Sequence, residues 1–425
     1  MQKKLHIPSQ VSCSSARVYL TKYEEFILKQ GYDLTPDPSQ ADVILIDTCG
    51  ANLDKEDQSI DLIRKSQASA KPDVQIIVSG CLAGINPKRI EENFNGQYFS
   101  PKNEKQLALI LGVDPEEAKF LNPLEVRGGF MGGDSYTGSS PFFRFALKSL
   151  TTAHQINNTI PLTNVPLIGK FLDCTQGANS KAYAITISQG CLGNCSFCVI
   201  PQAKGKTQSI PMVAIIEKIK EVVNQGVKKI ILTSEDTGAY GKDIGTTFVD
   251  LLRRIHEIDG DFSIHIHFFD PRWLRPYGKE LLEILAKGKV RYLQAPIQSG
   301  SNAMLGQMRR VYQVEQVLPY IQEFRKKLPN LALSTQIIAG FPGETEEDFQ
   351  LTRNLLRLNL FHWVQIFDYS ERPGAATEKI PNHHSMDTIK KRAAILSRDW
   401  KLARFKIYPF LGLRAKTWNW APSGS

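Results

Sequence analysis

The feature that most constrains this fold is a regular alternation of short apolar runs with helical patterns in the second half of the chain. Beyond residue 210, runs such as KKIILTSE and FSIHIHFF alternate with amphipathic stretches such as IPMVAIIEKIKEVVNQG and KELLEILAKG. A strand, a crossover helix and a further strand predict a parallel sheet with right-handed connections. We therefore expect an α/β fold in which residues 183–408 form a partial (β/α) barrel.

A second, smaller alternation covers residues 1–117. The apolar runs ADVILIDTC and VQIIVSGC end in Cys49 and Cys81, KLHIPSQVSC ends in Cys13, and a helical pattern follows each. In a doubly wound α/β domain the carboxyl ends of the strands converge on one edge, so the three thiols are expected near one another. Because cysteine also favours buried strands, spacing alone leaves a metal centre and three buried thiols equally open.

The composition narrows the classes of protein that this chain can belong to. No stretch approaches the ~18 apolar residues of a membrane helix, and MQKKLHIPSQ lacks the apolar core of a signal peptide. Seven cysteines without an export signal argue for a reducing compartment, where thiols bind metals. We expect a cytoplasmic protein with no membrane partner, and its net charge of +9 permits a polyanion such as RNA.

Three of the cysteines lie within eight positions, in ISQGCLGNCSFCVI: Cys191, Cys195 and Cys198. A structural zinc site usually takes four ligands, and no second cysteine pair or histidine pair lies nearby. Three thiolates on a short loop suit a [4Fe-4S] cluster with one iron left open for a small molecule. The preceding AYAITIS predicts a strand, which places the loop at a barrel strand's carboxyl end, where such barrels keep their chemistry. A loop of buried thiols without metal is the alternative.

This cysteine motif resembles that of the radical S-adenosylmethionine (SAM) superfamily, and Phe197 stands where that superfamily keeps an aromatic residue. The resemblance implies that the open iron binds SAM and that one electron cleaves it to a 5′-deoxyadenosyl radical. A low-potential donor such as flavodoxin or ferredoxin is then an expected partner. Further SAM contacts are expected at strand ends, with the first three in place of the usual Gly-Gly-Glu: Thr233, Ser234, Glu235, Gln298, Ser299 and Gly340.

The chain as a whole resembles the radical SAM methylthiotransferase family, whose blocks occur here in the family's order as DTCGANLDKEDQS, VSGCLAGINP, LTSEDTGAYGKDIGT and IIAGFPGETEEDF. The resemblance implies that Cys13, Cys49 and Cys81 hold an auxiliary [4Fe-4S] cluster that supplies or carries the inserted sulfur. One SAM would methylate that sulfur, and a second would generate the radical that converts C–H to C–SCH3. Cys174 matches no ligand block and is interpreted as structural or incidental.

The substrate is less constrained by the sequence. The block LTSEDTGAYG is most similar to the branch that modifies N6-threonylcarbamoyladenosine in tRNA, which makes tRNA the first hypothesis. The segment 118–182, an interdomain linker or insertion, matches no family block, and the tail 409–425 is too short for the usual terminal TRAM-type domain. Both features favour a peptide or protein substrate, such as a ribosomally made natural-product precursor. A non-catalytic iron–sulfur electron-transfer protein is a third hypothesis.

A few other residues carry weaker expectations. RGGFMGGDSYTGSS, within segment 118–182, predicts a loop because it is rich in glycine and serine. Lys204 and Lys206 stand where the family keeps an arginine-rich stretch. His265 and His267 alternate with apolar residues, and satisfied barrel-interior histidines are a better interpretation than substrate contacts. Arg372, just past the last barrel strand, is expected at the mouth of the active site.

Overall fold

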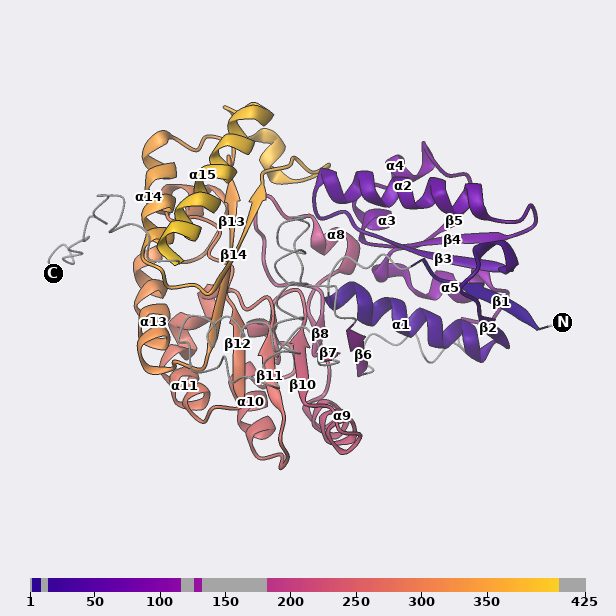
Figure 1. Cartoon of the computed structure of the whole chain (residues 1–425), viewed down its shortest axis with the longest axis horizontal. Coiled ribbons are helices and arrows are strands. Elements are labelled where there is room, and N and C mark those ends of the chain that lie inside the picture. Colours follow the sequence, from indigo (N-terminus) through magenta and orange to yellow (C-terminus); the bar gives the residue numbers. More distant parts are fainter. Residues whose placement is uncertain (1, 9–13, 116–125, 132–181, 405–425) are drawn as a thin grey trace, which may run out of the picture.

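The computed structural model describes residues 2–8, 14–115, 126–131 and 182–404. Two α/β units lie side by side, an N-terminal unit drawn in indigo and purple and a barrel drawn in magenta to yellow (Figure 1). Cys13, Cys174 and the tail 409–425 lie outside the described residues. Within the part of the chain that is described, no helix is long and apolar enough to cross a membrane.

The N-terminal unit is a five-stranded parallel sheet in the order β2-β1-β3-β4-β5, which is the doubly wound arrangement that the sequence predicts. Side chains of the central strand β3 alternate between two cores, with Val43 and Leu45 on one face and Ile44 and Ile46 on the other. The strands are β1 Lys3–His6, β2 Tyr32–Leu34, β3 Val43–Thr48, β4 Gln75–Gly80 and β5 Gln97–Tyr98. The helices are α1 Ser14–Lys29, α2 Leu53–Ser69, α3 Cys81–Ile85, α4 Pro87–Glu91 and α5 Lys105–Ile110.

The second unit is a seven-stranded sheet in the order β14-β13-β12-β11-β10-β7-β6, with every neighbouring pair parallel except β6 and β7. Its strands are β6 Arg127–Met131, β7 Ala182–Thr186, β10 Lys229–Thr233, β11 Ser263–Ile266, β12 Val290–Gln294, β13 Ala332–Ala339 and β14 Trp363–Asp368. A short antiparallel pair, β8 Ser188–Gln189 and β9 Gln208–Ser209, flanks the cysteine loop. The open barrel confirms the predicted α/β class.

Helices connect the barrel strands, and one large apolar core runs from Tyr183 to Leu396. The helices are α8 Ile200–Lys204, α9 Met212–Asn224, α10 Phe248–His256, α11 Leu274–Ala286, α12 Asn302–Gln307, α13 Val314–Lys327, α14 Glu346–Arg357 and α15 Met386–Arg404. Three short 3-10 turns follow strand ends, η5 Thr237–Ala239 and η6 Pro271–Trp273 among them. Each crossover brings the next strand's carboxyl end to the edge that carries the cysteine loop.

One sequence prediction is wrong in an informative way. The glycine-rich start of RGGFMGGDSYTGSS is the edge strand β6 and not a loop, and it pairs antiparallel with β7. A Cβ atom on Gly128 would stand 2.3 Å from the Tyr183 ring, and one on Gly129 would stand 2.9 Å from the Thr21 hydroxyl. The two glycines therefore let the strand approach its neighbours closely, which is a use of glycine inside strands.

The two units meet along the short helices α3 and α8, which lie side by side (Figure 1). A Cβ atom on Gly84 of α3 would stand 2.7 Å from the Cα of Ala203 in α8, so the two backbones are in close contact. An apolar cluster fills the junction, with Ile85 from one unit and Val199, Ala203 and Ala375 from the other. Because α3 begins at Cys81 and α8 follows Cys198, this packing brings the two predicted cysteine sites together.

Candidate active site

Cys191, Cys195 and Cys198 lie on one loop just after β7 and β8, at the carboxyl edge of the barrel. The backbone N–H of Gly193 donates to the Cys191 sulfur at 3.1 Å, and the N–H of Cys198 donates to the Cys195 carbonyl at 3.1 Å. A Cβ atom on Gly193 would lie 3.2 Å from the Cys191 sulfur. The loop therefore folds around its own sulfurs, with a glycine where a side chain would crowd them.

Burial keeps the thiols of this loop protonated when no metal is bound. Burial, then the charge of Asp236, raises the pKa of Cys191 to about 12, and burial with Cys195 raises the pKa of Cys198 to about 12. Such thiols become thiolates only when a metal's positive charge replaces their protons. Within the residues described, no three metal-binding side chains surround a single point as one ion requires. Three free cysteines on one short loop are a donor set that suits a [4Fe-4S] cluster, in which each thiolate binds a different iron.

A buried ionic network supports this loop and was missed by the sequence reasoning. The Arg310 guanidinium donates to the Cys195 sulfur at 3.4 Å and pairs with the Asp270 carboxylate at 2.9 Å. Arg272 also pairs with Asp270, at 2.7 Å, and the Trp273 indole N–H donates to both oxygens of Asp236 at 3.0 Å. The residues come from loops after different strands, so only the pair RR at 309–310 hinted at them in the sequence.

Cys49 and Cys81 follow the neighbouring strands β3 and β4, whose last residues Thr48 and Gly80 are register partners. The N–H of Cys49 donates to the Ser59 hydroxyl of α2 at 2.9 Å. Cys81 packs against the interdomain apolar cluster that contains Val199, the residue after Cys198. The two thiols thus end adjacent strands at the interface, while Cys13, at the end of the predicted first run, lies outside the described residues. This arrangement is compatible with the auxiliary cluster, whose ligand set stays a prediction.

Arg372 lies in this interface and not at an open mouth. Its side chain is 4% exposed and forms an ion pair with Glu56 of the N-terminal unit, which is also buried and paired with Arg89. Burial lowers the pKa of Arg372, an effect that the nearby Cys49 opposes. The Nε and Nη1 atoms of Arg372 have no hydrogen-bond partner. A buried guanidinium with spare donors beside Cys49 fits an anionic group at the auxiliary site.

Glu235, an expected SAM contact, is held in a second interdomain network. Its carboxylate accepts from the Lys204 ammonium at 2.5 Å, the Ser15 hydroxyl at 3.0 Å and the Gly190 N–H at 2.8 Å. Lys204 also donates to Ser15 at 2.7 Å and lies over the Tyr19 ring at 4.7 Å. Ser15 is two residues after Cys13, so this network links the predicted auxiliary site to the end of strand β10.

The other expected SAM contacts lie at strand ends around the same edge. Thr233 and Ser234, at the end of β10, are fully buried, and Ser234 accepts the N–H of Asp236 at 3.1 Å. Ser299 bonds to the Thr352 hydroxyl at 3.2 Å, which gives it a local structural partner. Phe197 packs edge-on against Phe341, with ring centroids 6.5 Å apart. Their contacts to SAM stay predictions.

Gln298 has the geometry of a ligand-facing position, whereas packing explains the glycine at position 340. Gln298 adopts a positive φ of 75°, is 8% exposed, and its side-chain oxygen is buried with no hydrogen-bond partner. An orphan acceptor held in an unusual backbone conformation is a recognised sign of a functional position. Gly340 has φ of 71°, and a Cβ there would stand 2.6 Å from Ile389. The orphan acceptor of Gln298 is compatible with a bound ligand, and the SAM contacts of both residues stay predictions.

His265 of β11 and His267, which directly follows that strand, lie beside Tyr292 of β12, with ring centroids 5.6 and 5.4 Å from that tyrosine. Burial lowers the pKa of each histidine to about 3, with Lys229 adding to the effect at His265. Burial also raises the pKa of Tyr292 to about 12. The barrel interior is therefore lined here by neutral aromatic and imidazole rings.

Comparison with known proteins shows which family this chain resembles. Residues 185–356 match the radical SAM superfamily, and residues 9–99 match an uncharacterised protein family, UPF0004. An open β/α barrel with C-x3-C-x2-C after its first parallel strand thus defines a radical SAM protein. The structure of the radical SAM methyltransferase TsrM from Kitasatospora setae is similar, with a TM-score of 0.59 at 12% identity over 89% of this chain and 75% of that one.

The relatives identify the group within that class. A probable threonylcarbamoyladenosine tRNA methylthiotransferase from Methanocaldococcus jannaschii is 30% identical over 87% of this chain and 76% of its own length. A ribosomal protein uS12 methylthiotransferase from Carboxydothermus hydrogenoformans is 29% identical over 83% and 72%. The chain belongs to the radical SAM methylthiotransferase family, and it is an enzyme of that kind.

Proposed function

We propose that this enzyme converts a C–H bond of N6-threonylcarbamoyladenosine in tRNA to C–SCH3, using two [4Fe-4S] clusters and two SAM molecules. The observation that carries the proposal is the junction of the two cysteine sites. Cys81 packs against the interdomain apolar cluster that contains Val199, the residue after Cys198, and Arg372 of the barrel pairs with Glu56 of the N-terminal unit. A sulfur source and a radical source are needed at one substrate carbon, and the packing of α3, which begins at Cys81, against α8, which follows Cys198, supports a shared site.

The cysteines and the strand-end residues would have different roles. Cys191, Cys195 and Cys198 would hold the cluster that binds SAM, and Cys13, Cys49 and Cys81 would hold the auxiliary cluster. When bound, the clusters would supply the electron and the sulfur, and SAM would supply the radical and the methyl group. Gln298 and Gly340 would orient SAM at the strand ends, and Arg310 would compensate the negative charge of the cysteine loop.

The substrate is proposed from similarity. Relatives named for the tRNA reaction support tRNA as the partner and the cytoplasm as the compartment. The uS12 relative, at nearly the same identity, supports a protein or peptide as the second candidate. A low-potential electron carrier such as flavodoxin or ferredoxin completes the proposed set of partners.

Mass spectrometry of tRNA nucleosides and of small peptides, from cells with and without the protein, tests the proposal. We expect the methylthiolated threonylcarbamoyladenosine to disappear when the protein is removed and to return with the unmodified gene. A Cys191→Ala gene should not restore it. Unchanged nucleosides together with a peptide that loses the mass of an SCH3 substitution would move the assignment to a peptide substrate.

A further inference from the structure

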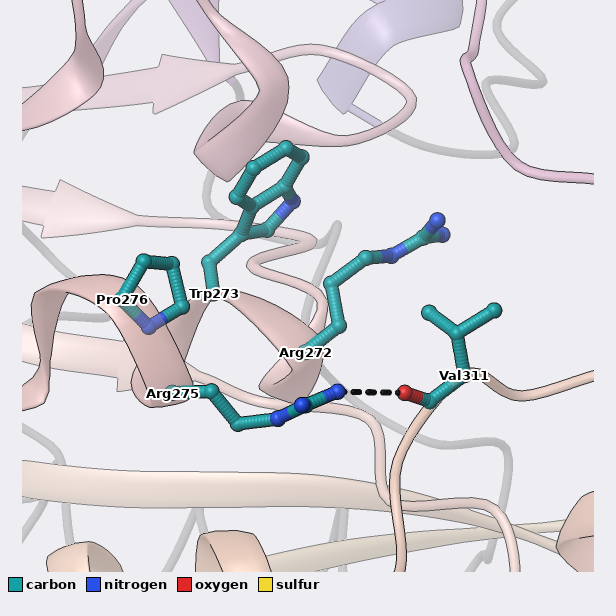
Figure 2. A pocket seen from close by; sticks show the side chains of 5 residues that line it. All are labelled: Arg272, Trp273, Arg275, Pro276 and Val311. Carbon is teal, nitrogen blue, oxygen red and sulfur yellow. Dashed lines mark hydrogen bonds between the residues drawn. The ribbon is translucent and has the colours of Figure 1, made fainter.

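An open pocket of about 460 Å³ lies on the carboxyl edge of the barrel, lined by Arg272, Trp273, Arg275, Pro276 and Val311 (Figure 2). Four of these residues follow β11, and Val311 lies in the loop before α13. Figure 2 shows the Arg275 guanidinium reaching the Val311 carbonyl, to which it donates at 3.0 Å. This bond joins the two loops into one surface.

The pocket lies directly behind the Cys191–Cys198 loop. The Arg272 Nη2 atom is 3.0 Å from the position that a Cβ on Gly193 would take, and Gly193 lies between Cys191 and Cys195. Arg310, next to Val311, touches the Cys195 sulfur from the other side. Arg272 and Arg310 therefore lie between this surface and the part of the loop that carries Cys191 and Cys195.

The surface around the pocket combines exposed apolar groups with positive charge. Val311 is 60% exposed, and Pro276 is also exposed. Arg275 and Lys242 are exposed, and the Lys242 ammonium stands 5.5 Å from the Trp273 ring and 5.2 Å from the Tyr277 ring. The charge of Arg272 is largely balanced by Asp270 at 2.7 Å. An apolar centre with a basic rim is complementary to an acidic protein that presents an apolar contact patch.

We propose that this surface, defined by Lys242, Trp273, Arg275, Pro276 and Val311, docks a small acidic protein that donates one electron. The inference rests on the proposed function, in which the cysteine loop holds an iron–sulfur cluster that must be reduced. The donor loses one electron at this surface and the cluster gains it, and no atom or proton is transferred. The exposed apolar side chains favour a folded protein partner over an RNA backbone, which would be held by charge alone.

The test measures the dissociation constant of flavodoxin, the probe, for the cluster-loaded protein at low and high salt. Arg275→Glu and Lys242→Glu should each weaken binding about tenfold at low salt, since each reverses one interfacial charge. Lys242→Glu leaves the bond between Arg275 and Val311 in place, so it separates docking from loop structure. The matched control is Arg291→Glu, an exposed arginine near the amino end of β12, which should change binding less than about twofold.

A second readout is the ratio of SAM cleavage driven by flavodoxin to that driven by dithionite, which needs no docking surface. We expect this ratio to fall about tenfold in both variants and to hold in the control, with iron content unchanged. Unaltered flavodoxin affinity in both variants would overturn the proposal, as would a loss of tRNA affinity in place of flavodoxin affinity. Failure of the unmodified protein to cleave SAM with dithionite would instead contradict the proposed function, while the binding measurements still decide on docking.

Discussion

Lys204 shows how one buried side chain can stabilise the interface between the two units. It stands where the related family keeps an arginine-rich stretch, yet its side chain is 4% exposed and its ammonium binds Glu235 and Ser15 inside the protein. The three groups come from positions 15, 204 and 235, so no local pattern could have revealed their contact. Removing one member leaves a buried charge without its partner, which costs far more free energy than loss of a surface pair.

Replacing Lys204 tests this directly. We expect Lys204→Met to lower the free energy of unfolding by about 3–5 kcal/mol, because the Glu235 carboxylate then stays buried without its ion-pair partner. Urea denaturation followed by circular dichroism measures the change. Lys206→Met is the matched control, since Lys206 is exposed, and it should change stability by less than about 0.5 kcal/mol. Equal effects of the two replacements would show that the Lys204 network is not stabilising.

The element that best illustrates the limits of sequence reasoning is β6. The β–α alternation predicted the parallel strands because their apolar runs are buried on both faces. Strand β6 has no such run, and its glycine-rich composition predicts a loop. Its conformation comes from pairing with β7 and from close packing on Tyr183 and Thr21, which are contacts between distant parts of the chain. The cysteine loops were predictable for the opposite reason, since their chemistry is carried by spacing along the chain.

Strand β11 makes a pH-dependent contribution to stability. His265 and His267 have folded-state pKa values of about 3, below the ordinary value of 6.5, so both are neutral in the folded protein at pH 5 to 7. In the unfolded chain they take up protons below pH 6.5. Their contribution is therefore fully present above pH 6.5 and is lost as pH falls toward 3, by about 1.4 kcal/mol per pH unit for each histidine.

The corresponding experiment follows urea unfolding of the protein between pH 7 and pH 5. The replacement His267→Gln should reduce the slope of unfolding free energy against pH by about 1.4 kcal/mol per unit, and the double replacement with His265→Gln by about twice that amount. A slope that is the same in all three proteins would contradict the buried, neutral state of these histidines.

At the scale of the whole molecule, the two cysteine sets lie on two different units. Mutation of one set should therefore leave the cluster of the other set in place. Replacing Cys191, Cys195 and Cys198 by Ala should abolish SAM cleavage and remove about half of the iron, because the auxiliary site keeps its own ligands. Replacing Cys13, Cys49 and Cys81 should spare SAM cleavage while ending formation of thiolated product. Iron analysis, SAM cleavage and product mass spectrometry on the same preparations provide the three readouts. Loss of all iron in the first variant would contradict the assignment of separate sites.

The edge strand also has a consequence for how the sequence can vary. Met131, the last residue of β6, is the register partner of Ala182, the first residue of β7, so the ends of these two antiparallel strands are neighbours in the sheet. Lengthening a connection between two such adjacent strand ends adds little loop entropy. A short turn would join the same two strands without moving β7 or the cysteine loop behind it. The ends of β6 and β7 are thus a position at which the sequence can be exchanged. A tag, a recognition peptide or the corresponding segment of a relative can be grafted there.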